Sequence, residues 1–397
     1  MITNTLDHNS HHSIITDVSA LTDYSWIELS KSAFSKNIAT YSSMLEPHVA
    51  IGVVVKANAY GHGMNEIGLL CQRNPQVQWL FVSHLSEAIQ LRNNGVTKSI
   101  LVMSATLDEF DKAAQYNIDL MMTDMQCIER AHAMGISLHK KIAIHLKIDT
   151  GLGRFGFFAH EALNVIKSVQ QLTGVQLQGI YSHFSESNNS SLEYTLSQED
   201  IFNNLLAQID AHYITIPVRH LSNSAAITAT SNSRVNLVRL GAGAYGIWPS
   251  EANRQLTSNT FSHSTLTPIL SWKTKIVHIK QVPAQTYIGY NRTYITQRPA
   301  TIAILPIGYY DGYDKRLSNR GTTRIGNQYA PVVGLVGMNN TTIDITAIPA
   351  CKLGDEVLLL GNHPHISSCD FAYLTGSLNT REITARLSPA ISRRITF

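Results

Sequence analysis

The chain has 397 residues, of which 44% are hydrophobic and 15% charged, which suits a globular protein of two domains with a large core. Its formal net charge of +3 is too small to indicate a nucleic-acid or membrane partner, and no run of about 18 apolar residues predicts a spanning helix. The four cysteines lie far apart without a CxxC motif, so the sequence predicts neither a disulfide framework nor a metal site.

The polar opening segment, residues 1–22, contains three of the 17 histidines but has neither the basic start nor the apolar stretch of a secretory signal. We therefore expect a loose extension there, and a protein that works in the cytoplasm. Ordered structure should begin with an alternating strand at residues 24–30. A helix should follow over residues 30–45, because a serine at its start can act as the N-cap.

Apolar strand patterns then recur roughly every 25 residues, separated by helical patterns such as 85–95 and 125–135, each closed by a glycine. Eight alternating β and α units predict a (β/α)8 TIM barrel, which we assign to residues 23–258. Its active site should lie at the C-terminal ends of the strands. The eight strands are expected at residues 52–55, 79–83, 99–103, 118–122, 142–148, 177–182, 218–222 and 236–240.

The pattern changes after the barrel. Residues 258–268 are rich in Ser and Thr and end in Pro268, which is typical of a linker. A mostly antiparallel β domain is predicted at residues 259–397, with one short helix at 369–378. Its strand patterns lie at residues 269–282, 301–308, 330–338, 341–346 and 355–361.

The first barrel strand leads into Lys56, followed by the turn-forming sequence ANAYGHG. A lysine at the mouth of an α/β fold can act as an amine nucleophile or a base, because burial disfavours its charged form. On its own such a lysine is more often structural. The residues at the ends of the other strands therefore decide whether a functional role for Lys56 is favoured. Tyr60 lies in the same turn. Polar side chains also lie at or just after the ends of later predicted strands, namely Lys147, Asp149, Arg154, His183, Ser224 and Arg239.

Serine and glycine-rich backbone follows the last two strands, where barrels of this type commonly bind phosphate through N–H groups. A phosphate site that faces a strand-end lysine indicates a phosphorylated carbonyl cofactor. Pyridoxal 5′-phosphate, held as a Schiff base on Lys56, has both features. Structural interpretations stay open beside these: a surface pair of Lys147 and Arg154, a core histidine at His183, and strand packing by Tyr290 and Tyr294.

Eight segments, in order along the chain, resemble the successive motifs of bacterial alanine racemase. They are KANAYGHG, HLKIDTGLGRFG, GIYSHF, NSAA, VRLGAGAYG, IGYNRTY, PIGYYDGYDKRL and VGMNN. The resemblance implies a fold-type III pyridoxal phosphate enzyme that racemises a small amino acid, with alanine as the first candidate and D-alanine for peptidoglycan as the product. It also implies a head-to-tail homodimer in which the partner's C-terminal domain completes each site.

The resemblance also implies residue roles. Lys56 and the partner subunit's Tyr290 would be the two bases. Two are needed because racemisation removes a proton from one face of Cα and returns one on the other. The cofactor would be held by Lys56, Tyr60, His183, Ser224, Arg239, Gly241 and Ala242. The substrate would meet Arg154, Met338 and Tyr309. Lys147 matches a lysine that is carbamylated in many members.

Arg239 would face the pyridine nitrogen, with His183 behind it. Because a guanidinium does not release its proton, the ring would stay a weak electron sink, which suits a reversible proton shuttle. Two positions depart from the family pattern: Asn339 replaces an Asp, and Arg381 replaces a Tyr at the substrate entrance. A racemase of serine or another amino acid therefore stays an alternative. A fold-type III decarboxylase and a non-catalytic cofactor carrier are disfavoured, by Arg239 and by the second domain respectively.

Overall fold

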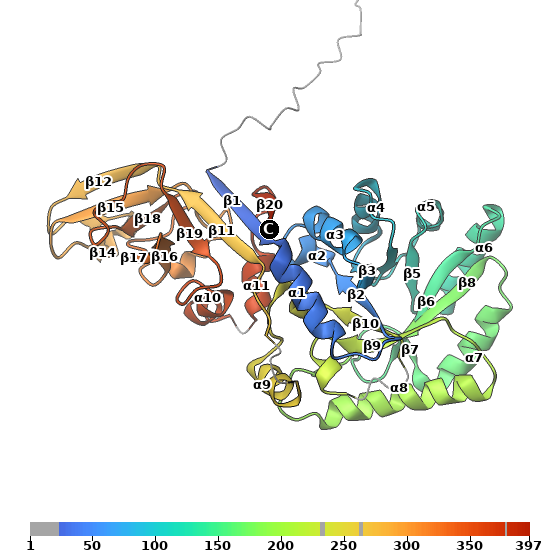
Figure 1. The fold of residues 1–397 in the computed structure, drawn as a ribbon. Helices are drawn as coiled ribbons and strands as arrows, with labels where there is room; N and C mark the ends of the chain where they lie inside the picture. The colour runs from blue at the N-terminus through green and yellow to red at the C-terminus, as the bar shows by residue number, and fades with distance from the viewer. Residues whose placement is uncertain (1–23, 231–234, 262–264, 378) are drawn as a thin grey trace, which may run out of the picture.

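The computed structural model describes residues 24–230, 235–261, 265–377 and 379–397. Figure 1 shows a barrel with surrounding helices on the right and a second unit made mainly of strands on the left. The extension expected at residues 1–22 lies outside the described residues. Within the described ranges, no helix is long and apolar enough to cross a membrane.

Eight parallel strands form one row from β5 to β6, and pairing between these two strands closes the row into a barrel. Each strand expected from the sequence is present, so the predicted TIM barrel is confirmed. A short ninth strand, β7 (Phe157–Phe158), pairs with β6 at the end of the row. The barrel strands are β2 (Ala50–Val54), β3 (Val77–Val82), β4 (Ser99–Val102), β5 (Asp119–Met122), β6 (Ile142–Asp149), β8 (Val175–Tyr181), β9 (Val218–Asn223) and β10 (Leu237–Leu240).

Helices lie outside the barrel (Figure 1). The serine cap expected for the first of them is confirmed, since the Ser30 hydroxyl accepts a hydrogen bond from the Ala33 N–H at 3.2 Å. Short 3₁₀ turns, η2 (Ala226–Thr228) and η3 (Ala242–Tyr245), follow β9 and β10. The helices are α1 (Lys31–Ser42), α2 (Lys56–Tyr60), α3 (Met64–Arg73), α4 (Leu85–Asn93), α5 (Phe110–Gln115), α6 (Met125–Ser137), α7 (Ala159–Gln170), α8 (Glu193–Ala211) and α9 (Glu251–Thr260).

The predicted end of the helix at 125–135 is wrong, because α6 continues through Gly135 to Ser137. A Cβ at Gly135 would lie 1.9 Å from the carbonyl oxygen of Gly174. The glycine therefore permits the close approach of the loop before β8, and it does not end the helix.

Large side chains fill the barrel interior. Both faces of a parallel barrel strand are covered, so strands such as β3 and β4 are mostly apolar. Gly52 makes room for one of the interior rings, since a Cβ there would lie 2.3 Å from the Phe81 ring. Because the interior is packed, a binding site has to form at the rim of the barrel. The interior cluster consists of Val54, Trp79, Phe81, Leu101, Met121, Tyr181, Val218 and Leu237.

The second unit contains a six-stranded sheet in the order β17-β16-β19-β11-β1-β20, together with the sheets β12-β15-β18 and β13-β14. Most pairings are antiparallel, so the predicted β architecture is confirmed. Helices α10 (Ser368–Thr375) and α11 (Thr380–Ala385) and the turns η4 (Tyr290–Arg292) and η5 (Lys315–Leu317) lie between strands. The strands are β1 (Ser25–Ser30), β11 (Leu270–Lys275), β12 (His278–Val282), β13 (Tyr287–Ile288), β14 (Tyr294–Ile295), β15 (Ala300–Leu305), β16 (Thr322–Ile325), β17 (Gln328–Pro331), β18 (Thr341–Asp344), β19 (Glu356–Leu360) and β20 (Ser392–Thr396).

Two segments of this unit differ from expectation. The strand expected at 24–30 is β1, which pairs antiparallel with β11 and parallel with β20, so it joins this sheet and not the barrel. The strand expected at 330–338 is wrong beyond Pro331, where β17 ends. Proline has no N–H for a sheet ladder, and Val332 forms only an isolated bridge.

The predicted domain limits, 22/23 and 258/259, stay predictions. The expected linker at 258–268 begins in the last turn of α9. Its residues 262–264 lie outside the described residues.

Candidate active site

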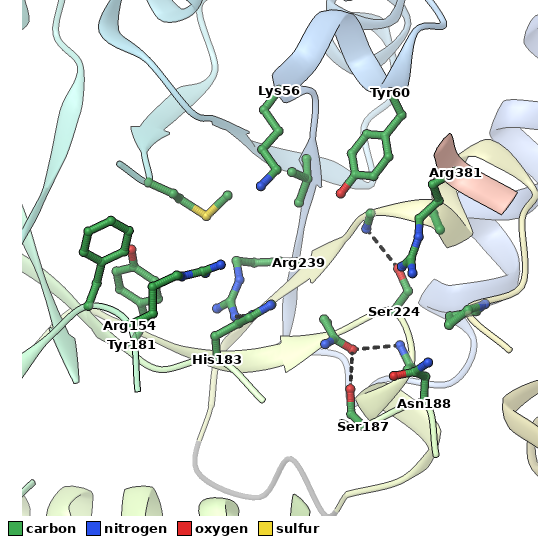
Figure 2. A pocket seen from close by; sticks show the side chains of 18 of the residues that line it. Lys56, Tyr60, Arg154, Tyr181, His183, Ser187, Asn188, Ser224, Arg239 and Arg381 are labelled. Carbon is green, nitrogen blue, oxygen red and sulfur yellow. Dashed lines mark hydrogen bonds between the residues drawn. The ribbon is translucent and has the colours of Figure 1, made fainter. Parts of the chain in front are cut away.

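A cavity with a volume of about 190 Å³ opens at the C-terminal ends of the barrel strands (Figure 2). Arg381, one of the two departures from the family pattern, is part of its wall. Most of the residues that the sequence assigned to a site are thus brought together, while their roles stay predictions. Those that line the cavity are Lys56, Tyr60, Lys147, Arg154, His183, Ser224, Arg239, Gly241 and Ala242.

Lys56 follows β2 and begins a strained turn, drawn as α2 in Figure 1. The φ angles of residues 57–60 lie between 52° and 57°, in the left-handed region that L-residues normally avoid. Glu87 helps to hold this turn, because its Oε1 accepts a hydrogen bond from the Ala57 N–H at 2.8 Å. The turn places Lys56 and Tyr60 together in the cavity wall (Figure 2). Strain of this kind is concentrated at functional sites.

The Lys56 amine points into the cavity in Figure 2. Burial lowers its pKa, the positive charge of Arg154 lowers it further, and the charge of Glu87 has the opposite effect. A larger share of the amine is therefore uncharged at neutral pH than in an exposed lysine. An uncharged amine can attack a carbonyl carbon or accept a proton.

At one end of the cavity, Tyr60, Ser224 and the backbone at Gly241 and Ala242 form a polar recess, which we call the Ser224 hollow. The Ser224 hydroxyl accepts a hydrogen bond from the Gly241 N–H at 2.9 Å. A Cβ at residue 241 would lie 2.9 Å from the Tyr60 hydroxyl, so a larger residue would narrow the hollow. Arg381 extends toward Ser224 in Figure 2. Hydroxyl, N–H and guanidinium donors are the groups that bind phosphate.

Arg239 projects from β10 into the cavity wall and is only 2% exposed. Its guanidinium lies within 3.1 Å of His220 Nδ1, His183 Nδ1 and the carbonyl oxygens of Ser182 and Leu221. These contacts fix the orientation of a group that can only donate hydrogen bonds. Burial lowers the pKa of Arg239 to about 10, so the guanidinium stays charged at neutral pH.

Two histidines contact Arg239, and the sequence pointed to only one of them. His183 lines the cavity, and burial together with the Arg239 charge lowers the pKa of its ring well below the ordinary value. The closer contact, 2.8 Å, is to His220, which sequence reasoning missed. The only signal for His220 was a polar residue inside a buried strand, and many such residues are structural.

Other cavity residues also had no predicted role. Ser187 donates to Asn223 Oδ1 at 3.1 Å, and the same oxygen accepts from the Ala225 N–H at 2.9 Å (Figure 2). These bonds hold the backbone on both sides of Ser224. They depend on loop geometry, which has no sequence periodicity. The remaining lining residues are Val54, Met103, Met121, Phe155, Tyr181, Asn188 and Pro249.

Lys147 lies on β6 and is 3% exposed, which excludes its interpretation as a surface residue. Its amine donates to the carbonyl oxygen of Ile148 at 3.0 Å and lies 5.1 Å from the centre of the Tyr181 ring. The pKa of Lys147 is lowered to about 7, mainly by burial and also by the charge of Arg239, while the charge of Asp149 opposes this effect. A larger share of this amine is therefore uncharged at neutral pH than in an exposed lysine.

Three predicted residues, Tyr290, Tyr309 and Met338, belong to the second unit and are not among the described residues that line the cavity. Their side chains are 74%, 42% and 56% exposed. In one chain these three residues therefore lie on the surface, away from the cavity that contains Lys56. Asn339, the second departure from the family pattern, is exposed beside Met338.

The loops that carry these three residues are in contact. The Tyr309 N–H donates to the carbonyl oxygen of Gly337 at 3.0 Å, next to Met338. A Cβ at Gly289, which precedes Tyr290, would lie 3.4 Å from the backbone nitrogen of the loop residue Leu335. We call the exposed area formed by Tyr290, Tyr309 and Met338 the Tyr290 surface.

Comparisons with known proteins cover nearly the whole chain. Two family models match: "Alanine racemase, N-terminal domain" at residues 29–249 and "Alanine racemase, C-terminal domain" at residues 269–395. The chain is 34% identical to alanine racemase 2 of Caldanaerobacter subterraneus subsp. tengcongensis over 373 residues, 93% of each chain. It is 35% identical to the alanine racemase of Methanococcus maripaludis over 372 residues, 93% of this chain and 97% of the relative. A solved alanine racemase from Clostridium difficile 630 has a TM-score of 0.87 at 31% identity, covering 95% of this chain and 96% of that one.

Proposed function

Because this chain belongs to the alanine racemase family, we propose that it interconverts L-alanine and D-alanine with pyridoxal 5′-phosphate as its cofactor. The family matches confirm the expectation of an isomerase of this family. The observation that carries the cofactor proposal is a single cavity that holds both the Lys56 amine and the Ser224 hollow. A phosphorylated carbonyl compound would use both features.

The lining residues fit this cofactor. Lys56 would bond its carbonyl carbon, and the Ser224 hollow would hold its phosphate. Arg239 would donate to the ring nitrogen and keep its own proton, with His183 beside it. When bound, the cofactor supplies an electron-withdrawing ring that acidifies the substrate Cα–H. Arg154 would bind the substrate carboxylate.

Racemisation requires a base on each face of Cα, and the cavity of one chain supplies Lys56. We infer that the partner subunit's Tyr290 is the second base, and that Tyr309 and Met338 meet the substrate from the same side. This inference is supported by the exposure of all three on the Tyr290 surface, because a head-to-tail homodimer would cover that surface.

Racemisation of L-alanine by the purified protein with added pyridoxal 5′-phosphate tests the function, with circular dichroism as the readout. We expect alanine to react much faster than serine. No loss of optical rotation for either amino acid at saturating cofactor would refute the proposal, and faster turnover of serine would reassign the substrate. We further propose that the reaction takes place in the cytoplasm and supplies D-alanine for peptidoglycan. A gene disruption that D-alanine fails to rescue would contradict that role.

Carbamylation of Lys147 is a further part of the proposal. Carbon dioxide reacts with the uncharged amine, which a pKa of about 7 makes available at neutral pH. In isotope-labelled bicarbonate, we expect a carbamate signal by carbon NMR that the Lys147→Met variant lacks. The signal should weaken as the pH falls below about 7, because the amine of the folded protein then becomes protonated.

Lys98 provides the matched control for this experiment. Its amine donates hydrogen bonds to the carbonyl oxygens of Cys71, Asn74 and Val77, so we expect no reaction there. The Lys98→Met variant should retain the signal. Persistence of the signal in the Lys147→Met variant would show that another amine is modified.

Arg381 should strengthen cofactor binding. Its guanidinium lies at the Ser224 hollow. Burial raises the pKa of the Tyr60 hydroxyl, and the charge of Arg381 opposes this effect. The Nε atom donates to Asn379 Oδ1 at 2.7 Å, and we expect the Nη groups to donate to the phosphate. A charged hydrogen bond contributes about 1.5–3 kcal/mol, so Arg381→Ala should weaken cofactor affinity about tenfold or more. Titration of the apoprotein, followed by absorbance, measures this.

Arg386 gives the control for Arg381. It follows α11 and pairs with Glu382, and Arg386→Ala removes the same charge from the surface. Cofactor affinity should not change in that variant. Equal affinities of Arg381→Ala and the unmodified protein would rule out a phosphate contact.

A further inference from the structure

A chain of buried hydrogen bonds leads from Arg239 into the barrel. Arg239 Nη1 lies 2.8 Å from His220 Nδ1, and His220 Nε2 lies 3.2 Å from His145 Nδ1. His145 Nε2 in turn lies 3.1 Å from Asp119 Oδ2. Both imidazole rings are fully buried, whereas the Asp119 side chain is 15% exposed. We call these four residues the histidine chain.

The histidine chain crosses the barrel because of one glycine. Its members come from β10, β9, β6 and β5, and β8 lies between β9 and β6. Gly179 of β8 pairs with His145, and a Cβ there would lie 2.1 Å from His145 Nδ1. Without a side chain at residue 179, His145 passes over β8 and reaches His220. The Tyr181 ring stacks on His220, with a centroid distance of 4.5 Å, and restricts its movement.

The two ends of the histidine chain fix the direction of every hydrogen bond in it. A guanidinium only donates, so His220 Nδ1 must accept and the ring proton must sit on Nε2. His220 Nε2 then donates to His145 Nδ1, which leaves the His145 proton on Nε2, facing a carboxylate that only accepts. Burial and the Arg239 charge lower the pKa of His220 well below its ordinary value, in agreement with a neutral ring.

We propose that His145 and Asp119 are positioning residues for racemisation, which act through His220 on the orientation of Arg239. The expected effect on racemisation rests on the proposed function. The assignment of the ring protons rests on the hydrogen-bond geometry alone. If His220 carried its proton on Nδ1, two donors would face each other at 2.8 Å and the guanidinium would turn away. The Asp119 carboxylate prevents this, because it holds both rings in the tautomer that offers Arg239 an acceptor.

Nitrogen NMR of protein with labelled histidines tests the tautomers without reference to activity. The His145→Gln and His220→Gln variants assign the two rings. We expect both rings to be neutral, with the proton on Nε2. A proton on Nδ1 of either ring would overturn the proposal, even if the protein racemises alanine as expected. The expected tautomers in a protein without racemase activity would instead uphold the geometry and reject the proposed function.

The His145→Phe and His145→Gln variants test the effect on catalysis. Phenylalanine leaves the His220 Nε2–H without an acceptor, so we expect kcat to fall about tenfold, equivalent to about 1.4 kcal/mol, with little change in KM for alanine. Glutamine can accept from His220 and donate to Asp119, so it should restore most of kcat. Equal losses in the two variants would indicate a packing role and overturn the proposal.

Asp119→Leu provides a second test that places no new ring in the core. It should lower kcat in the same direction as His145→Phe and should remove the preference for Nε2–H at His145. Asp210→Asn is the matched control, because Asp210 is a carboxylate at the same end of the barrel that pairs with Arg219. It should change neither kcat nor the tautomers. Unchanged kcat and tautomers in Asp119→Leu would also overturn the proposal.

Discussion

The Lys56→Ala variant is expected to lose racemisation by about a thousandfold or more. A positioned base alone contributes about 10²–10⁴-fold, and Lys56 is proposed both to bond the cofactor and to move the Cα proton. Its reactivity follows from burial and from the charge of Arg154, which lower its pKa. Two measurements check the prediction: the racemisation rate, and the visible absorbance band of the protein with cofactor, which borohydride should remove only when Lys56 is present.

Lys56→Arg separates the reactive amine from its positive charge. Arginine keeps a cation at the end of β2 but has no nitrogen that becomes uncharged near neutral pH. We therefore expect this variant to be as inactive as Lys56→Ala and to lack the borohydride-sensitive band. A band that survives in both variants would place the covalent bond on another residue, and Lys147, with its pKa of about 7, would be the first to examine.

The barrel could be predicted from sequence because each strand carries a local apolar pattern, and strands such as β2 and β10 pair with neighbours in a regular order. The position of β1 in the sheet of the second unit could not be predicted from the sequence. It lies between β11 and β20, and β20 comes from the opposite end of the chain. Pairing over such a separation depends on the complete fold, which local periodicity does not contain.

Some residues of the site could likewise be predicted from the sequence, and others could not. Lys56, Ser224 and Arg239 follow or end strands within short motifs, so their convergence at the rim of the barrel was predictable. The link from His220 to His145 was not, because these residues are on strands separated by β8, and their contact depends on Gly179. In sequence, both histidines look like isolated polar residues in buried strands, which are more often structural than functional.

Whether two chains share each site can be decided with variants that are inactive alone. Tyr290→Phe should lower racemisation by about 10²–10⁴-fold, because it removes the proposed base on one face, and should leave cofactor binding unchanged. Tyr290 is 74% exposed in one chain, so loss of its hydroxyl should not disturb the fold. Tyr287→Phe is the matched control: this residue is also exposed, in the neighbouring strand β13, and the variant should keep full activity.

Heterodimers of Lys56→Ala and Tyr290→Phe chains, isolated with two different affinity tags, give the decisive result. If the second unit of one chain completes the cavity of the other, one site in each heterodimer combines an intact Lys56 with an intact Tyr290. Such heterodimers should recover about half of the normal activity. If both bases came from the same chain, neither site would contain both of them and the mixture would stay inactive. Recovered activity would therefore assign the Tyr290 surface to the partner's site, as its exposure suggests.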